Sequence, residues 1–223
     1  MQSTRAASKA ILYDLDGTLI DHFTAIQRAI NHAQEQIGVP LSGYDLVRAT
    51  VGGSIEVTMT RLIGPELAPR AIPLYYEFFA KIMFEDLHPL PGAALLLEQL
   101  HTRGMRQAIL TNKTGDTARA VIKFLGWDQW LELVVGSQDT PWRKPMPEFV
   151  LHAVGKLGLQ PAETVLIGDS PFDVEAATNA GVCCYAVATG SHTRPQLLAH
   201  KPAPEAVFDN LNDLGAAAFG LIG

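Results

Sequence analysis

The sequence predicts an α/β fold, in which helices cover a parallel β-sheet, with an all-helical insertion near the N-terminus. Two observations carry this prediction. Short apolar, β-rich runs alternate with helical patterns along most of the chain, whereas residues 22–88 contain helical patterns and no convincing strand. The chain has 223 residues, of which 48% are hydrophobic and 18% charged, which is enough to bury a core in one large domain or in one domain with an insertion.

The expected elements alternate regularly outside the insertion. The apolar runs predict strands at Ala10–Tyr13, Gln107–Leu110, Leu133–Val135, Thr164–Ile167, Val182–Val187 and, more weakly, Ala206–Phe208. The helices between them end at glycines: Ala93–Arg103 stops at Gly104, a helix opening with Pro147 stops at Gly158, and Val174–Ala180 stops at Gly181. Strands separated by helices in this way form parallel sheets.

Within the insertion, apolar residues recur at helical spacing. One such set is Ile26, Ile30, Ala33 and Ile37, and a second, aromatic set is Ile72, Tyr75, Tyr76, Phe79 and Met83. We interpret the aromatic stripe as the packed core of a helical unit rather than as a ligand site, because amphipathic helices bury such stripes against one another.

Charge and composition exclude several classes of partner. The net charge is −6 and no Lys/Arg block stands out, so nucleic acid is not an expected partner. Met1–Lys9 is polar, unlike a signal peptide, and no apolar run of about 18 residues follows it, so we expect a cytoplasmic protein without a membrane partner. Cys183 and Cys184 are neighbours in an apolar run and are expected to be buried thiols. No pattern points to an oligomeric state.

The first candidate site motif follows the first expected strand. Asp14 and Asp16 point to one face of the chain because strand side chains alternate, and they lie where open α/β sheets place ligands. Gly17 permits a sharp turn and a close approach of backbone amides to an anion. Asp16-Gly17 alone would be an ordinary turn, whereas the whole string Asp-x-Asp-Gly-Thr, ending at Thr18, is a more specific pattern.

Two further motifs supply hydrogen-bond donors. Thr111 and Asn112 replace the apolar run at the end of the second expected strand, where their hydroxyl and amide groups would suit phosphate oxygens. Lys144 precedes the helix that opens at Pro147, and its ammonium could meet a phosphate as a point charge. Taken alone, each motif has an ordinary interpretation, as turn chemistry or as a solvated surface lysine.

The last motif, Gly168–Asp173, is an acidic loop that follows a buried strand. Asp173 could be a simple helix N-cap. Asp169 would lie close to Asp14 and Asp16, and the carboxylates would repel one another unless a cation sat between them. Magnesium prefers hard oxygen ligands of this kind, together with a substrate phosphate.

These motifs together resemble the haloacid dehalogenase superfamily, in its phosphoglycolate phosphatase-like branch with a helical cap. The resemblance runs from about Lys9 to Leu214 and rests on four ordered motifs: Asp14–Thr18, Thr111-Asn112, Lys144-Pro145 and Gly168–Asp173. It implies a doubly wound, Rossmann-like parallel core with an inserted all-helical cap domain. The implied core is residues 1–21 and 89–223, and the implied cap is residues 22–88.

The resemblance also implies a mechanism. Asp14 would be the nucleophile that forms an aspartyl phosphate, and Asp16 would protonate the leaving oxygen and then activate water. Mg²⁺ would bind the Asp14 carboxylate, the Asp16 backbone carbonyl and Asp169, and Asp173 would support this shell from outside.

Phosphate and substrate contacts follow from the same resemblance. The expected phosphate-binding residues are Gly17, Thr18, Thr111, Asn112 and Lys144. Substrate choice is expected to reside in the cap, with the candidates His22, Arg48, Gly52 and Gly53. Arg48 could pair with a second anionic group on the substrate or face solvent, and His22 departs from the small serine that many relatives carry after the aspartate at position 21.

Several functions stay open at this point. A small phosphorylated metabolite is the expected substrate, with phosphoglycolate suggested by resemblance alone. Asp16 disfavours dehalogenases and phosphonate hydrolases, which lack an aspartate there. A sugar phosphomutase and an inorganic pyrophosphatase remain alternatives. A non-catalytic binding module is less favoured, because Asp14, Asp16, Lys144 and Asp169 are all present.

Overall fold

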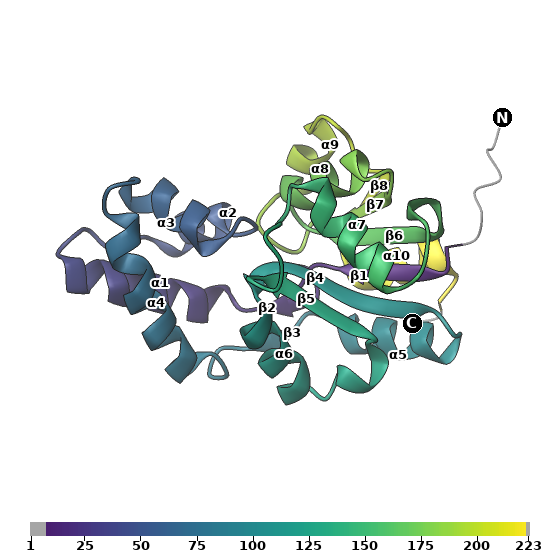
Figure 1. Ribbon diagram of the computed structural model, residues 1–223, viewed down its shortest axis with the longest axis horizontal. Helices are drawn as coiled ribbons and strands as arrows, with labels where there is room; N and C mark the ends of the chain where they lie inside the picture. Colours follow the sequence, from purple (N-terminus) through teal and green to yellow (C-terminus); the bar gives the residue numbers. More distant parts are fainter. Residues whose placement is uncertain (1–7, 222–223) are drawn as a thin grey trace.

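The computed structural model describes residues 8–221. Its centre is a six-stranded parallel sheet with the strand order β5-β4-β1-β6-β7-β8 (Figure 1). The bounds are β1 Ala10–Tyr13, β4 Arg106–Thr114, β5 Leu133–Ser137, β6 Thr164–Gly168, β7 Cys183–Val187 and β8 Ala206–Phe208. The predicted α/β class and the six predicted strands are confirmed.

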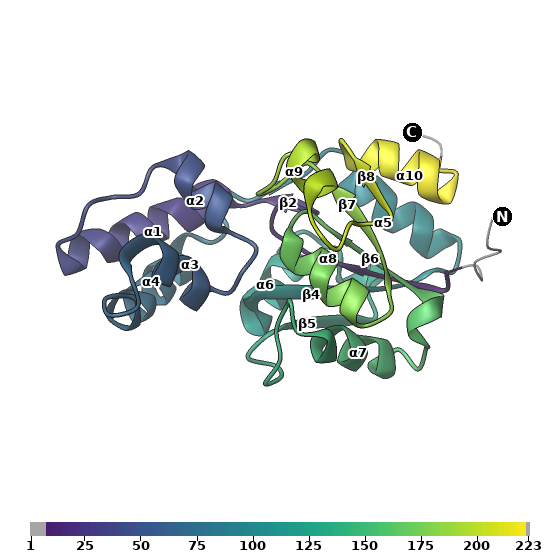
Figure 2. The same cartoon turned by 90° about the horizontal axis from the view of Figure 1, so that it is seen from above.

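Helices cover both faces of the sheet, as the views in Figures 1 and 2 show. On one face lie α5 (Ala93–Thr102), α6 (Gly115–Phe124) and α10 (Leu211–Phe219), on the other α7 (Pro147–Lys156) and α8 (Pro171–Asn179), and α9 (Arg194–Ala199) packs near β8. The side chains of β1 alternate between these two layers. Cys183 and Cys184 are both buried, as predicted.

The strand order places a topological switch at β1. Leu12 lies opposite Ala108 of β4 on one side and opposite Leu166 of β6 on the other. The chain adds β4 and β5 on the first side and then crosses over to add β6, β7 and β8 on the second. Open α/β sheets bind ligands outside the carboxyl ends of their strands at such a point. A ligand is therefore expected beside the carboxyl ends of β1, β4 and β6.

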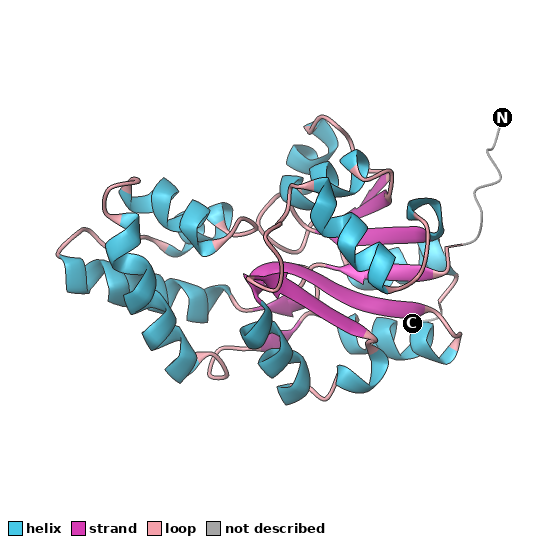
Figure 3. Cartoon of the chain, in the orientation of Figure 1, coloured by secondary structure: helices cyan, strands magenta, loops and turns pink. Residues whose placement is uncertain are grey.

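A separate group of helices connects β1 to the rest of the sheet, and Figure 3 shows it as all-helical. Its members are α1 (Phe23–Ile37), α2 (Tyr44–Thr50), α3 (Ile55–Ile63) and α4 (Ala68–Ile82). These helices share one hydrophobic cluster, in which Tyr75 and Phe79 are buried against Ile26 and Ile30. We call this group the cap.

A two-stranded antiparallel pair that the sequence analysis missed connects the cap to the core. Ile20–Asp21 forms β2 and His88–Pro89 forms β3. Strands of two residues are too short to show a period of hydrophobicity, which explains the omission. The pair lies beside the expected cap boundaries at residues 22 and 88, which stay a prediction. Among the described residues, no helix is both long and apolar enough to span a bilayer.

Candidate active site

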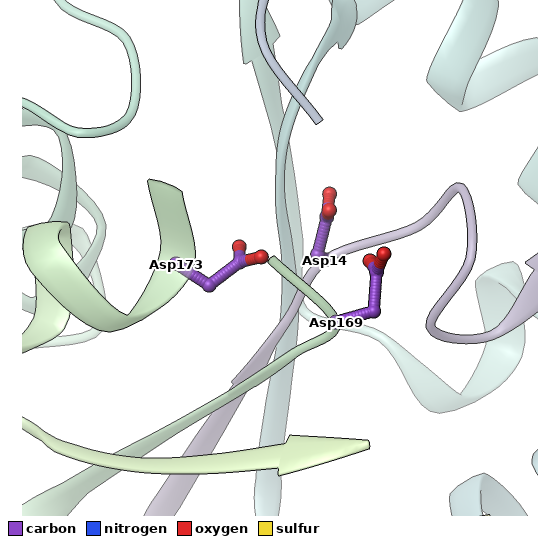
Figure 4. A group of neighbouring side chains, drawn as sticks. All are labelled: Asp14, Asp169 and Asp173. Atoms are coloured by element: carbon purple, nitrogen blue, oxygen red, sulfur yellow. The ribbon is translucent and has the colours of Figure 1, made fainter. Parts of the chain in front are cut away.

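Three buried aspartates converge at the carboxyl edge of the sheet (Figure 4). Asp14 follows β1, Asp169 follows β6, and Asp173 lies in the first turn of α8. A carboxylate oxygen from each lies within 4.8 Å of the others. The predicted convergence of Asp14 with the Gly168–Asp173 loop is therefore present in the structure.

The electrostatics of this cluster call for a cation. Burial raises the pKa of Asp14, the Lys144 ammonium opposes this effect, and the charge of Asp173 adds to it. Burial also raises the pKa of Asp169, and the neighbouring Asp14 and Asp173 carboxylates raise it further. Carboxylates packed this closely disfavour one another's charged forms unless a cation lies among them. An all-oxygen donor set fits a hard divalent ion of the magnesium type.

Lys144 is a fully buried cation at the centre of the site. Its Nζ lies 2.9 Å from Oδ1 of Asp14 and 2.6 Å from Oδ1 of Asp173. Although burial favours the neutral amine, the two carboxylates raise the pKa of Lys144 above its usual value. The ammonium is therefore charged and holds both aspartates in place. The surface interpretation of this lysine is excluded.

Both oxygens of Asp173 are occupied by protein donors. Oδ1 accepts from Lys144, and Oδ2 accepts from the backbone N–H of Ser170 at 3.1 Å and from its hydroxyl at 2.6 Å. A Cβ on Gly168 would lie 2.2 Å from the Asp173 carboxyl carbon, so a glycine is needed there. These contacts fit the supporting position predicted for Asp173, and they also make it the N3 residue of a capping box.

Asp169 is held by residues that the sequence analysis did not place there. Its Oδ1 accepts from the hydroxyl of Thr18 at 3.1 Å, and its Oδ2 accepts from the N–H and hydroxyl of Ser191 at 2.7 and 2.9 Å. A Cβ on Gly190 would lie 2.0 Å from the same oxygen. Ser191 and Gly190 follow β7, where small polar residues end an apolar run. The same pattern, small polar residues after an apolar run, is the one that predicts a site at Thr111, and it indicates a site at this loop as well.

Two predicted phosphate-binding residues make other contacts. The Thr18 hydroxyl donates to Asp169, and the amide of Gly17 donates to the carbonyl of Ile20 at 2.8 Å within the turn. Gly17 has φ +86°, and a Cβ there would lie 2.9 Å from the Asp169 carboxylate. In this structure both residues shape the Asp169 site, because the donors expected for phosphate are already used.

Asp16 lies in a different environment from Asp14. Lys113 Nζ contacts both carboxylate oxygens, at 2.9 and 2.8 Å, and Nδ1 of the buried His22 lies 3.5 Å from Oδ1. Although burial alone would raise it, the Lys113 ammonium and His22 hold the pKa of Asp16 well below its usual range. Lys113 was not among the predicted site residues, although it directly follows Thr111-Asn112.

The two residues of the second motif, Thr111 and Asn112, make different kinds of contact. Lys113 N–H donates to the Thr111 hydroxyl oxygen at 3.2 Å, which leaves the hydroxyl proton of Thr111 for another acceptor. The Asn112 amide nitrogen donates to the carbonyls of Gly52 and Lys144 at 2.9 and 3.0 Å, and its oxygen accepts from Lys144 N–H at 2.9 Å. Asn112 thus anchors the cap loop and the Lys144 segment instead of offering donors to phosphate, contrary to the expectation.

Two adjoining cavities separate the sheet edge from the cap. A small one of about 20 Å³ contacts Asp14 and Asp16, and is completed by Val51, Gly52, Gly53, Thr111, Asn112 and Lys113. The larger, of about 60 Å³, is lined by Asp16, Ile26, Val51, Gly53, Ile55, Thr58, Tyr75, Tyr76, Phe79, Asn112, Lys113, Thr114 and Thr117. The aromatic stripe of α4 therefore serves both as cap core and as a cavity wall, whereas the sequence analysis expected only a core.

The cap residues expected to select substrate fall into two groups. Gly52 and Gly53 line the smaller cavity, and Gly53 also lines the larger one. Arg48 instead donates to the carbonyls of Gly190 and Thr189, at 3.0 and 3.1 Å, and is not among the residues that line either cavity. It joins the cap to the loop that holds Asp169. His22 is buried, with Nε2 2.7 Å from the carbonyl of Met83.

The site thus combines a doubly wound sheet, three buried aspartates at the carboxyl edge of that sheet and a helical cap beside them. This arrangement is that of a capped α/β hydrolase. The model for the haloacid dehalogenase-like hydrolases matches residues 11–187. The chain belongs to this family.

Individual relatives place the chain in the branch named above. Phosphoglycolate phosphatase 1 of Pseudomonas aeruginosa is 30% identical over 220 residues, covering 92% of this chain and 78% of that protein. A phosphoglycolate phosphatase of Yersinia pestis is 29% identical, with 82% of each chain covered. A haloacid dehalogenase-like hydrolase of Streptococcus pneumoniae superposes with a TM-score of 0.85 at 24% identity, covering 96% of this chain and 99% of the other, which shows a shared fold. The protein is thus an enzyme of the phosphatase branch of this family.

Proposed function

We propose that this protein is a magnesium-dependent phosphatase that hydrolyses a small phosphate monoester through an aspartyl phosphate on Asp14. The observation that carries the proposal is the division of the Asp-x-Asp motif. Asp14 faces Asp169 and the Lys144 ammonium, whereas Asp16 faces the cavity under the cap. This division supports one carboxylate as the group that attacks phosphorus and the other as the group that serves the leaving oxygen.

Each step can be assigned to residues of this chain. A carboxylate oxygen of Asp14 attacks phosphorus, the bond from phosphorus to the leaving oxygen breaks, and that oxygen takes a proton from Asp16. Asp16 then takes a proton from a water molecule, which attacks phosphorus and releases inorganic phosphate from Asp14. Lys144 keeps the Asp14 carboxylate oriented, and the hydroxyl of Thr111 can donate to the transferring oxygens.

Magnesium would be held by the Asp14 carboxylate, the Asp16 backbone carbonyl and Asp169, with Asp173 in support, and would offset the repulsion between the nucleophile and the anionic phosphate. The supporting observation is the raised pKa of both Asp14 and Asp169, whose charged forms need a compensating cation.

Phosphoglycolate is the first substrate to test, because the two relatives described above carry that name. A phosphomutase or an inorganic pyrophosphatase would use the same pair of aspartates. Hydrolysis of 2-phosphoglycolate, sugar phosphates and pyrophosphate by one preparation, ranked by kcat/KM, separates the three.

Replacing Asp14 tests the nucleophile. Asp14→Asn keeps the size of the side chain but removes its nucleophilicity, so we expect a folded protein whose kcat falls by about 10³-fold or more. Asp128→Asn is the matched control, because Asp128 is an exposed aspartate of the α/β domain, and this variant should keep full activity. Phosphate release and acid-quenched intact-protein mass spectra measure turnover and the phosphorylated enzyme.

Two results would contradict the proposal. One is that Asp14→Asn keeps substantial turnover and that wild-type protein, quenched with acid during turnover, carries no phosphoryl group. The other is full activity after chelation of divalent metal, with no response to added Mg²⁺.

A further inference from the structure

Lys113 is the one site residue with a buried charge that the proposed chemistry does not yet use. Its side chain leaves the end of β4 and is only 7% exposed. The ammonium lies between the core and the cap, because it contacts Asp16 on one side and lies 5.0 Å from the ring centre of Phe79, in α4, on the other. Lys113 lines both cavities.

The ammonium has capacity for a further partner. A protonated lysine has three N–H donors, and the two oxygens of Asp16 account for two of them. Asp16 also interacts with His22, so its negative charge is not used by Lys113 alone. The aromatic face of Phe79 is attractive to a cation but leaves an N–H able to reach an acceptor in the cavity.

The cavity is where the leaving group must lie. The leaving oxygen has to reach Asp16 to receive a proton, and the rest of that group must then extend into the cavity that Asp16 and Lys113 line. With about 60 Å³, this cavity has room for a group of only a few non-hydrogen atoms. Val51, Tyr75 and Phe79 form apolar walls beside this group.

The remaining cavity walls offer no other positive charge. Of the described residues that line it, only Asp16 and Lys113 have charged side chains. Arg48, which from the sequence could meet a substrate anion or face solvent, donates to the carbonyls of Thr189 and Gly190. An anionic group in this largely apolar space would be costly without a paired cation, and Lys113 is the cation within reach.

We propose that Lys113 is a specificity-determining residue that binds an anionic group on the leaving part of the substrate. The substrate class is then a short phosphate ester or anhydride whose leaving group carries a carboxylate or a second phosphate. This inference rests on the proposed phosphatase function and adds the residue that recognises the leaving group.

The test compares three substrates of similar length: 2-phosphoglycolate, with a carboxylate, inorganic pyrophosphate, with a second phosphate, and ethyl phosphate, with a neutral leaving group. The measured quantity is the ratio of kcat/KM for each anionic substrate to kcat/KM for ethyl phosphate. For 2-phosphoglycolate against ethyl phosphate, this ratio removes any effect of Lys113 on the position of Asp16 that the two esters share, because both release an alcohol that needs a proton. Pyrophosphate releases phosphate, which depends less on an acid, so its ratio reports the second phosphate and the weaker need for Asp16 together. In the wild type the ratio should exceed one for at least one anionic substrate, and that substrate identifies the source of the anion.

The decisive variant is Lys113→Met, which keeps most of the side-chain volume and removes the charge. We expect its ratio to fall by about tenfold to a hundredfold, as for a charge-assisted hydrogen bond, mainly through KM, and Lys113→Arg to restore part of the loss. Arg48→Met is the matched comparison and should leave the ratio unchanged. If circular dichroism shows that Lys113→Met is not folded, the same kcat/KM ratio is measured on Lys113→Gln, which also removes the charge but keeps a polar side chain.

Several outcomes overturn the inference alone: a wild-type enzyme that prefers ethyl phosphate, equal losses on all three substrates in the Lys113 variants, or a ratio that falls in Arg48→Met and not in Lys113→Met. A wild type that hydrolyses none of these substrates and no 4-nitrophenyl phosphate overturns the proposed function, and this inference with it.

Discussion

Each aspartate of the first motif forms an ion pair with a different lysine. Lys144 pairs with Asp14 beside Asp169, and Lys113 pairs with Asp16 beside the cavity. The pKa shifts are opposite: burial and the charge of Asp173 raise the pKa of Asp14 in spite of Lys144, whereas Lys113 and His22 lower the pKa of Asp16 in spite of burial. Two carboxylates whose environments separate their pKa values are typical of sites in which each has its own role.

The form of Asp16 seen here suits the second half of the proposed reaction. A carboxylate paired with Lys113 can accept a proton from water. In the first half Asp16 must carry a proton, which the ion pair opposes. An anionic leaving group that engages Lys113 would weaken this opposition, so that the substrate itself would favour the acid form of Asp16.

At the residue scale, the carboxylate cluster predicts how stability depends on pH. Asp14 and Asp169 both hold a proton more tightly in the folded chain than in the unfolded one. The folded state therefore binds more protons between the ordinary carboxyl pKa, about 4, and neutrality, and stability falls as the pH rises through this window. We expect the Tm of metal-free protein to fall from about pH 5 to about pH 8, and Mg²⁺ to stabilise it most at the upper end.

Asp169→Asn tests this effect, because it removes one of the two titrating groups and keeps the size of the side chain. It also replaces one oxygen that accepts from Thr18 or Ser191 by an NH2 group, so the comparison uses the slope of Tm with pH and not the absolute Tm. Its Tm should vary less with pH in the presence of chelator. Thermal unfolding of both proteins across this range makes the comparison, and equal slopes would show that the cluster does not control the pH dependence.

At the element scale, the site is assembled from loops that follow parallel strands. The loop after β1 supplies Asp14, the end of β4 supplies Thr111, the loop after β6 supplies Asp169, and the loop after β7 supplies Ser191. Each loop is short or tightly bonded, so the sheet fixes the positions of these side chains. The glycines at the close approaches let carboxylates and backbone meet.

Gly190→Ala tests the loop after β7. The added Cβ would lie 2.0 Å from Oδ2 of Asp169, so the carboxylate or the loop must shift. We expect Mg²⁺ affinity to fall by about 10–100-fold, the usual effect of disturbing the support of a metal ligand. Mg²⁺-dependent thermal stabilisation and the Mg²⁺ dependence of turnover both measure this affinity.

Gly155→Ala is the matched control, because Gly155 lies exposed in α7 and no atom lies within 4 Å of the added Cβ. It should keep wild-type Mg²⁺ affinity and gain about 0.5–1 kcal/mol in the free energy of unfolding. Equal Mg²⁺ affinities in the two alanine variants would exclude a role of this loop in the metal site.

At the scale of the whole molecule, the cap rests on the core through a few polar contacts near the site. Arg48 donates to the carbonyls of Thr189 and Gly190, and Asn112 donates to the carbonyl of Gly52. Because Gly190 also touches the Asp169 site, the position of the cap and the geometry of the carboxylate cluster share one loop.

Arg48→Met should loosen this contact. We expect amide hydrogen exchange to become about tenfold faster in α2 and in residues 189–191, because a charge-assisted hydrogen bond is lost. Arg70→Met, an exposed arginine of α4, is the control and should change exchange in neither segment. Unchanged exchange in Arg48→Met would mean that Arg48 does not hold the cap, and would leave it available for a substrate anion.

Much of the fold follows from local patterns in the sequence. The six strands were readable because their apolar runs are bounded by glycines and polar loops, and α7 begins at its predicted proline. The start of α8 was predicted too late, because Pro171 and the capping box of Ser170 and Asp173 extend the helix by a turn. Asp14, Asp16 and Asp169 were placed at strand ends by the same local reasoning.

The sequence by itself determined that Asp14 and Asp169 meet, because parallel strands bring their carboxyl ends to one edge of the sheet. It also placed Asp16 in this group, where the structure has Asp173. Only the tertiary structure decided which cation faces which partner. Arg48 contacts core carbonyls, Thr18 contacts Asp169, and Lys113 reaches Asp16 beneath Phe79 of the cap. The physical reason is that a strand end fixes the backbone position of a residue. The direction in which a long side chain or a hydroxyl points depends on neighbours that lie far away in the sequence.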